Sequence, residues 1–467
     1  MAVTILESCM VTPSEETPRH GLWLSNLDLM VARSHTSLVL VYKPGRGPAS
    51  CFSPDVLKAS LSKALVPFYP LAGRLAEDRT GRPEIRCTGD GVLFVAARID
   101  ATLDDMRDLV PSGELRRMFV LSADGEHSDI LVIVRALAFM VLDWNSEACN
   151  GCAQATLFRC GALCLATSFH RLAADGGAIG NFLNTWAAIA RGFNEAVMPR
   201  PCLDRTLLRA RSPPAVRFDH TDVYSWRGGG GAKPKVPFEA AILPISRFQA
   251  DALKGSAQGK KVTTFSTVVA HVWRCACTAR GLAGTEDTRL YMTAEARSRV
   301  RPPLPDGYLG NTIVRASAVD KVDAIISGSL SITTSRISKA IAMLKDEFIR
   351  SLVDYAELAT SDPEAAADLR IQEWTVIPET DLWVVSWLGV TFSDVDFGWG
   401  RPSFIRPATI QGGAVFLIPS PDCHGGIDVA VAMEPERLAR FKELFYEGLQ
   451  RHPPVSSDTH AADPSKF

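Results

Sequence analysis

The residues of this chain that could do chemistry stand together at residues 168–182, in the stretch SFHRLAADGGAIGNF. His170 and Arg171 lie a few residues before Asp175. A histidine can take the proton from an attacking hydroxyl or amine. An arginine cannot, because its guanidinium stays protonated at physiological pH and offers no lone pair. The first question is therefore which of these two neighbours faces the reaction.

The elements on either side of this stretch decide that orientation. If the stretch ends a strand, His170 and Arg171 point to opposite faces, and only a β-bulge would aim His170 where Arg171 points. Behind Asp175, apolar residues recur at helical spacing until Gly192, which suits a helix C-cap. We therefore expect a helix that begins directly after Asp175.

Strands and helices alternate along the rest of the chain. HTSLVLVYKP, RPEIRC and GVLFVAA predict strands, and SPDVLKASLSKALVPF predicts a helix capped by Ser53 with Pro54 in its first turn. FEAAILPI and IDVAVAM predict strands in the second half, where TFSTVVAHVWRCACTARG and ERLARFKELFYEGL predict helices. Residues 198–235 are rich in Pro, Arg and Gly. We therefore predict an N-terminal domain at 1–197, a crossover at 198–235, a second domain at 236–450 and a flexible tail at 451–467.

Composition excludes several classes of function. Lys plus Arg number 50 against 52 for Asp plus Glu, so we expect neither nucleic acid nor an anionic membrane as a partner. The start of the chain has no secretory pattern, and the most apolar run, residues 130–142, is too short to span a bilayer, so we expect a cytoplasmic protein. No phosphate loop of the Walker or dinucleotide type is present. We expect a small-molecule substrate.

The chain has 11 cysteines, which we expect to be reduced thiols in a cytosolic protein. Cys149, Cys152, Cys160, Cys164 and His170 could be drawn as a zinc site. Their later spacings fit no common ligand pattern, so we expect no bound metal. A zinc protein is kept as a minor alternative.

Several separated motifs carry a resemblance to a known family: LWLSNLDL, ALVPFYPLAGRL, HRLAADG, HVWRCACTARGL, PPLPDGYLGN, and DFGWGRP at residues 396–402. Together they resemble the plant BAHD acyltransferases, most closely the hydroxycinnamoyl-CoA transferase branch, from about residue 5 to residue 450. The resemblance implies a mixed α/β monomer in which two similar-sized chloramphenicol-acetyltransferase-like domains surround a central channel. It also implies acyl transfer from an acyl-CoA co-substrate, with no permanently bound cofactor.

The resemblance assigns roles to particular residues. Asp175 matches an aspartate that pairs with a second-domain arginine, here Arg297, Arg299 or Arg301. Trp387 matches a tryptophan beside the developing oxyanion, although an ordinary buried aromatic is an equal reading. Asp396 matches a loop residue that serves architecture more than proton transfer. For the CoA phosphates, the candidates are Lys260, Lys261, Arg297 and Arg299.

The acceptor side departs from relatives that acylate shikimate or quinate. Gly389 stands where they carry an arginine, and Val385 lies near the place of a threonine, whereas His35 matches a pocket histidine. A buried carboxylate would then lack its partner. We therefore expect a neutral alcohol or an amine as acceptor, with Glu373, Glu379 or Asp381 as a counter-charge for a cationic amine.

Two further departures affect the site. The family places its histidine four residues before the aspartate, and Arg171 holds that position. Two readings stay open: an enzyme that moves a hydroxycinnamoyl or benzoyl group, or a member that binds acyl-CoA without turnover. Residues 135–153 also interrupt a predicted strand, and we hypothesise an intron or gene-model artefact, which transcript sequencing would test.

Overall fold

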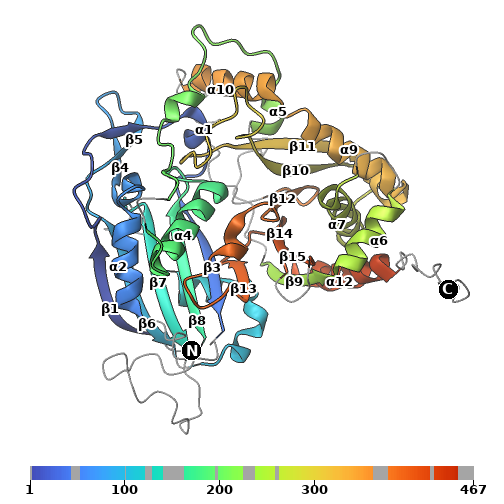
Figure 1. Ribbon diagram of the computed structural model, residues 1–467. Helices are drawn as coiled ribbons and strands as arrows, with labels where there is room; N and C mark the ends of the chain where they lie inside the picture. The colour runs from blue at the N-terminus through green and yellow to red at the C-terminus, as the bar shows by residue number, and fades with distance from the viewer. Residues whose placement is uncertain are drawn as a thin grey trace, which may run out of the picture.

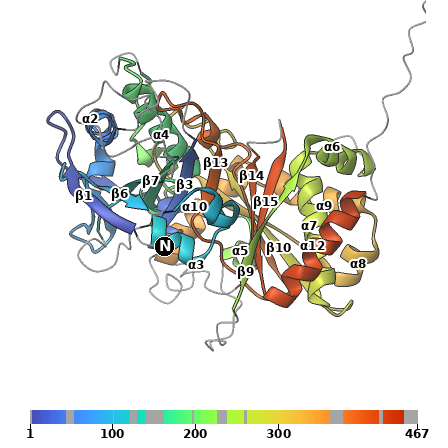
Figure 2. The same ribbon diagram turned by 90° about the horizontal axis from the view of Figure 1, so that it is seen from below.

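The computed structural model describes residues 3–43, 53–99, 101–120, 129–139, 162–194, 198–224, 237–257, 262–360, 377–420 and 425–450. Two lobes lie side by side, and each is built on a six-stranded sheet with helices packed against it (Figures 1 and 2). A third, three-stranded sheet joins β2 (Gly21–Trp23), β5 (Pro83–Arg86) and β4 (Arg74–Glu77). The expected mixed α/β class is confirmed.

The first sheet carries the sequence motif. Its order is β1 (Val3–Val11), β6 (Val92–Ile99), β7 (Val132–Phe139), β8 (Leu163–His170), β3 (His35–Tyr42) and β13 (Phe404–Pro407). Neighbouring strands are antiparallel except β6 and β7, which are parallel. Helices α2 (Pro54–Ala64) and α4 (Gly176–Ala190) pack together over this sheet (Figure 1).

Local sequence signals explain where these helices begin. The Ser53 hydroxyl accepts the N–H of Val56 and Pro54 occupies the first turn of α2, as predicted. The Asp175 carboxylate accepts the N–H of Ala178 at 3.0 Å and so caps α4. Strand β8 ends at His170, and Arg171 is the first residue of the turn that follows.

The second sheet has the order β11 (Ile313–Lys321), β10 (Asp287–Glu295), β12 (Leu382–Ser386), β14 (Ala414–Pro419), β15 (Ile427–Met433) and β9 (Glu239–Ile245). Its central helix is α7 (Thr264–Arg280), which contacts α6 (Arg247–Ser256), α8 (Val322–Ser327), α9 (Leu330–Ala342) and α12 (Pro435–Gln450). The remaining helices are α1 (Asn26–Leu29), α3 (Gly113–Phe119), α5 (Thr221–Tyr224) and α10 (Asp346–Thr360), and 3-10 turns span Tyr69–Ala72, Asp104–Leu109, Arg205–Leu208 and Thr391–Asp394.

A strand from the C-terminal half of the sequence belongs to the first lobe, and the two lobes share part of one apolar core. Strand β13 comes from the C-terminal half of the sequence but pairs with β3 in the first sheet, with Phe404 opposite Val41 (Figure 2). The apolar core of the first lobe also takes in Ala414 and Ala430 from the second sheet. The predicted domain boundaries stay predictions, and a division by sequence position alone would separate β13 from its sheet.

Three expectations from the sequence can be checked only on the described part of the residues that they concern. The first five residues of the suspected insertion, 135–139, form the last five of the eight residues of β7, whereas residues 140–153 lie outside the described residues. Cys149, Cys152 and Cys160 also lie outside them. Cys164 and His170 sit near opposite ends of β8, about 20 Å apart at the rise of a strand, so they cannot ligate one zinc ion. Within the described ranges, no helix is long and apolar enough to cross a membrane.

Candidate active site

His170 is the last residue of β8 and its side chain is buried, at 3% exposure. Its Nδ1 accepts the N–H of Leu172 at 3.3 Å, and its ring meets the ring of His35, on the neighbouring strand, edge-on at 5.1 Å. Burial, together with the nearby His35 and the cations of Arg33 and Arg171, lowers the pKa of His170 to about 3. The imidazole is therefore neutral, and the lone pair on Nδ1 is already engaged. His170 is a poor base in this position.

Arg171 follows His170 at the junction between β8 and α4, where the first lobe faces the second. Its side chain is exposed, although its neighbours His170 and Leu172 are both buried. Its N–H donates to the Ser34 carbonyl at 2.9 Å, and its own carbonyl accepts from Asn311 Nδ2 at 2.7 Å. Desolvation by the surrounding protein lowers the pKa of the guanidinium. The side chain is thus reached by water while it stands deep between the lobes.

The helix that follows is fastened to the second lobe through Asp175. Arg297 donates from Nη1 to Asp175 Oδ2 at 2.9 Å and from Nη2 to Oδ1 at 2.8 Å. Thr312 adds its N–H and its hydroxyl, both at 2.9 Å from Oδ2. Of the three arginines named by resemblance, Arg297 is the partner. A Cβ on Gly177 would lie 3.0 Å from Arg297 Nη1, so this close approach depends on glycine.

A buried network, which sequence reasoning missed, holds the loop behind Arg171. Arg205 donates to the carbonyls of Leu172 and Ala173 at 3.1 and 2.6 Å. It also pairs with Asp28 at 3.0 Å, where the two side chains are 1% and 0% exposed. Asn311 donates to the same Asp28 oxygen. The Ser-x-x-Asp pattern at Ser25 predicts a capping box at Asp28, but no local signal points to Arg205.

Trp387 and Asp396 occupy different settings. The Trp387 ring packs edge-on against Phe392 and Phe416 at 5.3 and 5.4 Å, and its side chain stays partly exposed. Within the described part of the chain, its indole N–H has no hydrogen-bond partner. Asp396 instead accepts the N–H groups of Gly398 and Gly400 at 2.7 and 2.9 Å. Asp396 thereby shapes a turn, which agrees with an architectural role.

Of the residues expected on the acceptor side, His35 lies against His170. His35 Nε2 bonds the Ile130 carbonyl at 2.7 Å, and burial lowers the pKa of this histidine. Val385 is half-buried in β12. Gly389 is exposed, and a Cβ added there would meet nothing within 4 Å. An acceptor pocket at Gly389 would thus have space but no cation of its own.

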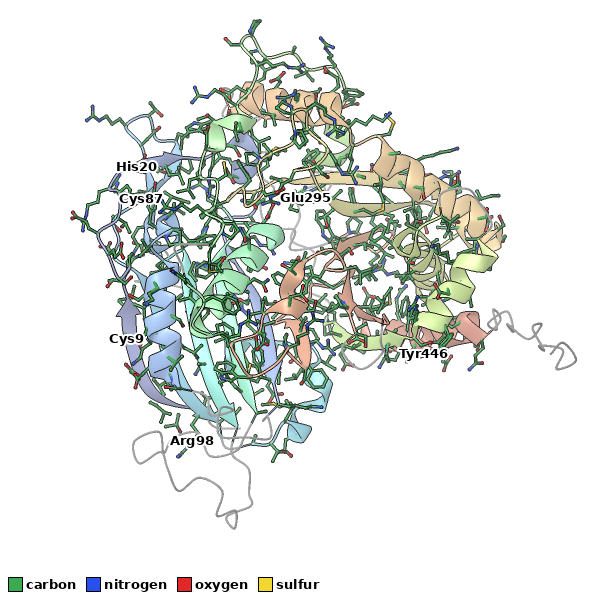
Figure 3. All side chains as sticks on the ribbon, in the orientation of Figure 1. Cys9, His20, Cys87, Arg98, Glu295 and Tyr446 are labelled. Atoms are coloured by element: carbon green, nitrogen blue, oxygen red, sulfur yellow. The ribbon has the colours of Figure 1, made fainter. Side chains whose placement is uncertain are left out.

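The charged residues expected to bind ligands are largely engaged elsewhere. Both terminal nitrogens of Arg297 bond protein groups, among them Glu295, which lies at the end of β10 between the two lobes (Figure 3). Arg299 donates to the carbonyls of Glu295, Ile341 and Leu344. These contacts argue against both arginines as CoA ligands. Lys260, Lys261 and Glu373 lie outside the described residues.

The acidic residues expected as counter-charges for a cationic acceptor occupy other settings in the second lobe. Buried Asp381 accepts the hydroxyl of Thr380 at 2.9 Å and the N–H of Arg289 at 3.1 Å, and so belongs to the second lobe's own packing. Glu379 is exposed in the turn before β12. Neither is among the groups that shift the pKa of Arg171.

Comparison with known proteins bears on the family to which this chain belongs. Residues 1–448 match the model of the Transferase family. A putrescine hydroxycinnamoyltransferase 1 of Oryza sativa subsp. japonica is 56% identical over 96% of this chain and 100% of its own length. A hydroxycinnamoyl-CoA:5-hydroxyanthranilate N-hydroxycinnamoyltransferase of Avena sativa is 35% identical over 95% of this chain and 99% of its own.

Among solved structures, that of F. graminearum TRI101 with ethyl coenzyme A superposes with a TM-score of 0.74 at 18% identity, over 91% of this chain and 97% of the other. This likeness supports the fold. The family model covers nearly the whole chain, and the sequence identity to the rice protein extends over that protein's full length. The chain therefore belongs to the Transferase family, as a CoA-dependent acyltransferase of the hydroxycinnamoyltransferase-like BAHD branch.

Proposed function

We propose that this protein transfers a hydroxycinnamoyl or benzoyl group from its CoA thioester to an amine. One observation carries the choice of an amine: among the described residues around His170 and Arg171, no side chain is suited to act as a base. Arg171 holds the family's base position, and the pKa of buried His170 is about 3. An alcohol must lose its proton as it attacks, whereas an unprotonated amine already has a free lone pair. Amine acceptors in the names of the rice and oat relatives support the same choice.

The bond changes balance without a side-chain base. The amine nitrogen attacks the thioester carbonyl carbon, and the carbonyl electrons move to oxygen. When the carbon–sulfur bond breaks, the CoA thiolate leaves and takes up the proton that the nitrogen gives up, so the products are an amide and free CoA thiol. Trp387 is the candidate donor to the transient oxyanion, because its indole N–H has no other partner among the described residues.

A protein that binds acyl-CoA without turnover is the weaker reading. Aminolysis as written does not use the histidine that Arg171 replaces, so the loss of that base does not by itself disable the protein. The 56% identity to a named transferase over its full length also favours an active enzyme.

The test is release of free CoA thiol from coumaroyl-CoA, with products identified by mass spectrometry. We expect the protein to acylate amines and not alcohols, and Arg171→His to add turnover of alcohols by restoring a base. Acylation of alcohols by the unaltered protein would contradict the argument. So would the absence of turnover with every amine tested.

We also propose a monomer that acts in the cytoplasm, with acyl-CoA as co-substrate and no resident cofactor. These proposals rest on the family resemblance and on the composition of the chain. Light scattering during size-exclusion chromatography and imaging of a tagged protein would test the first two.

A further inference from the structure

We infer that Arg171 forms an anion-binding subsite for the acceptor, and that the acceptor is an aromatic amine bearing a carboxylate. This inference rests on the proposed function, because it names the class of amine that the site takes. It replaces the expectation that a carboxylate would lack a partner, since that expectation considered positions 385 and 389 only.

The first support is the surroundings of the Arg171 side chain. It is exposed to solvent between two buried neighbours, and no carboxylate of the described residues pairs with it or raises its pKa. Two other arginines that contact this part of the chain are each paired with a carboxylate, Arg205 with Asp28 and Arg297 with Asp175. An arginine held deep in a protein without a counter-charge favours a ligand that supplies one.

The second support is its position beside the acceptor residues. The backbone N–H of Arg171 donates to the carbonyl of Ser34. The ring centres of the next residue, His35, and of His170 lie 5.1 Å apart. From the opposite lobe, Arg315 is near enough to Arg171 for the two cations to repel, and this repulsion adds to the burial that lowers the pKa of Arg315 to about 10. The Arg315 guanidinium also lies 4.8 Å from the centre of the Trp383 ring. The junction is thus positive and has an aromatic surface.

These charges select among amines. An aliphatic amine is protonated at neutral pH, with a pKa near 10, and a second positive charge beside Arg171 and Arg315 is repelled. An aromatic amine is uncharged at neutral pH and can attack at once. A carboxylate on the same ring can accept two hydrogen bonds from the guanidinium.

The experiment measures kcat/KM for CoA release from coumaroyl-CoA with aniline, the three aminobenzoate isomers and 1,4-diaminobutane. It compares the unaltered protein with Arg171→Gln, Arg171→Lys and a matched control, Arg116→Gln, which removes an exposed arginine from α3. Calorimetric titration of the CoA-bound protein with benzoate and benzamide measures the anion site without turnover.

We expect the best aminobenzoate to exceed aniline, with a preference that falls about 10- to 150-fold in Arg171→Gln. Arg171→Lys should keep part of this preference, and Arg116→Gln all of it. Benzoate should bind more tightly than benzamide only while position 171 is cationic.

Four results would overturn the inference: an unchanged preference in Arg171→Gln, an equal loss with aniline and aminobenzoate, a rise confined to the KM of coumaroyl-CoA, or better turnover of the diamine. An equal loss with both amines would indicate that Arg171 stabilises the oxyanion. A rise confined to the KM of coumaroyl-CoA would indicate that it binds CoA. Turnover of amines without selective benzoate binding would support the proposed function and contradict the anion site. Selective benzoate binding without turnover of any amine would refute the proposed function and leave the anion site.

Discussion

Asp28→Asn removes the negative charge from the buried pair that supports the loop behind Arg171. Asp28 and Arg205 are 0% and 1% exposed, so the arginine left behind has almost no access to water. Breaking a buried pair from one side costs about 3–5 kcal/mol. Because Arg205 keeps its bonds to the Leu172 and Ala173 carbonyls, we expect the lower end, about 3 kcal/mol in the free energy of unfolding. For a chain of 467 residues whose lobes unfold together, the Tm shifts by roughly 1 °C per kcal/mol, so it should fall by about 3 °C.

Thermal and urea unfolding of four proteins measure this effect: the unaltered chain, Asp28→Asn, Arg205→Met and the double variant. Replacing both charges removes the unpaired ion. The loss in the free energy of unfolding of the double variant should therefore be at least about 2 kcal/mol smaller than the sum of the losses in the two single variants. Residual turnover of Asp28→Asn at low temperature should fall in kcat more than it rises in KM, because the loop shifts. A loss below about 1 kcal/mol in Asp28→Asn, or strict additivity, would refute the reasoning.

Further expected outcomes concern the pH response, the helix interface and the oxyanion. The pKa of His170 is about 3 in the folded protein against roughly 6.5 unfolded, so the unfolded chain binds the extra proton first and stability falls as pH drops from about 6.5 toward 3. The Tm of His170→Gln should therefore depend less on pH across that window, and an unchanged slope would exclude His170 as the cause. Gly177→Ala, whose Cβ would lie 3.0 Å from Arg297, should lower the free energy of unfolding by about 1–3 kcal/mol, whereas Gly255→Ala, in a helix with open space around it, should raise it by up to about 1 kcal/mol in urea titrations. Trp387→Phe should lower kcat about 100-fold or more with little change in the KM of coumaroyl-CoA, and an unaltered kcat would show that another group holds the oxyanion.

The elements around the site could be predicted because their signals are local. Ser53 and Pro54 mark the start of α2, and Asp175 caps α4 within three residues of its own position. The apolar run before Tyr42 forms β3 as expected. Capping and periodicity act over a few residues, so a single chain carries them in full.

The sequence by itself determined that β8 leads into α4 and that an arginine, which cannot act as a base, stands four residues before Asp175, because backbone preference and the chemistry of guanidinium are properties of the residues themselves. Only the tertiary structure decided that Arg297, 122 positions away, is the arginine that pairs with Asp175, that β13 joins the first sheet, and that Arg171 has no acidic partner among the described residues. Those outcomes depend on which distant surfaces pack together, and packing leaves no periodic trace along the chain. The direction of Arg171 could be argued from strand geometry, but its lack of a counter-charge could be seen only after both lobes were in place.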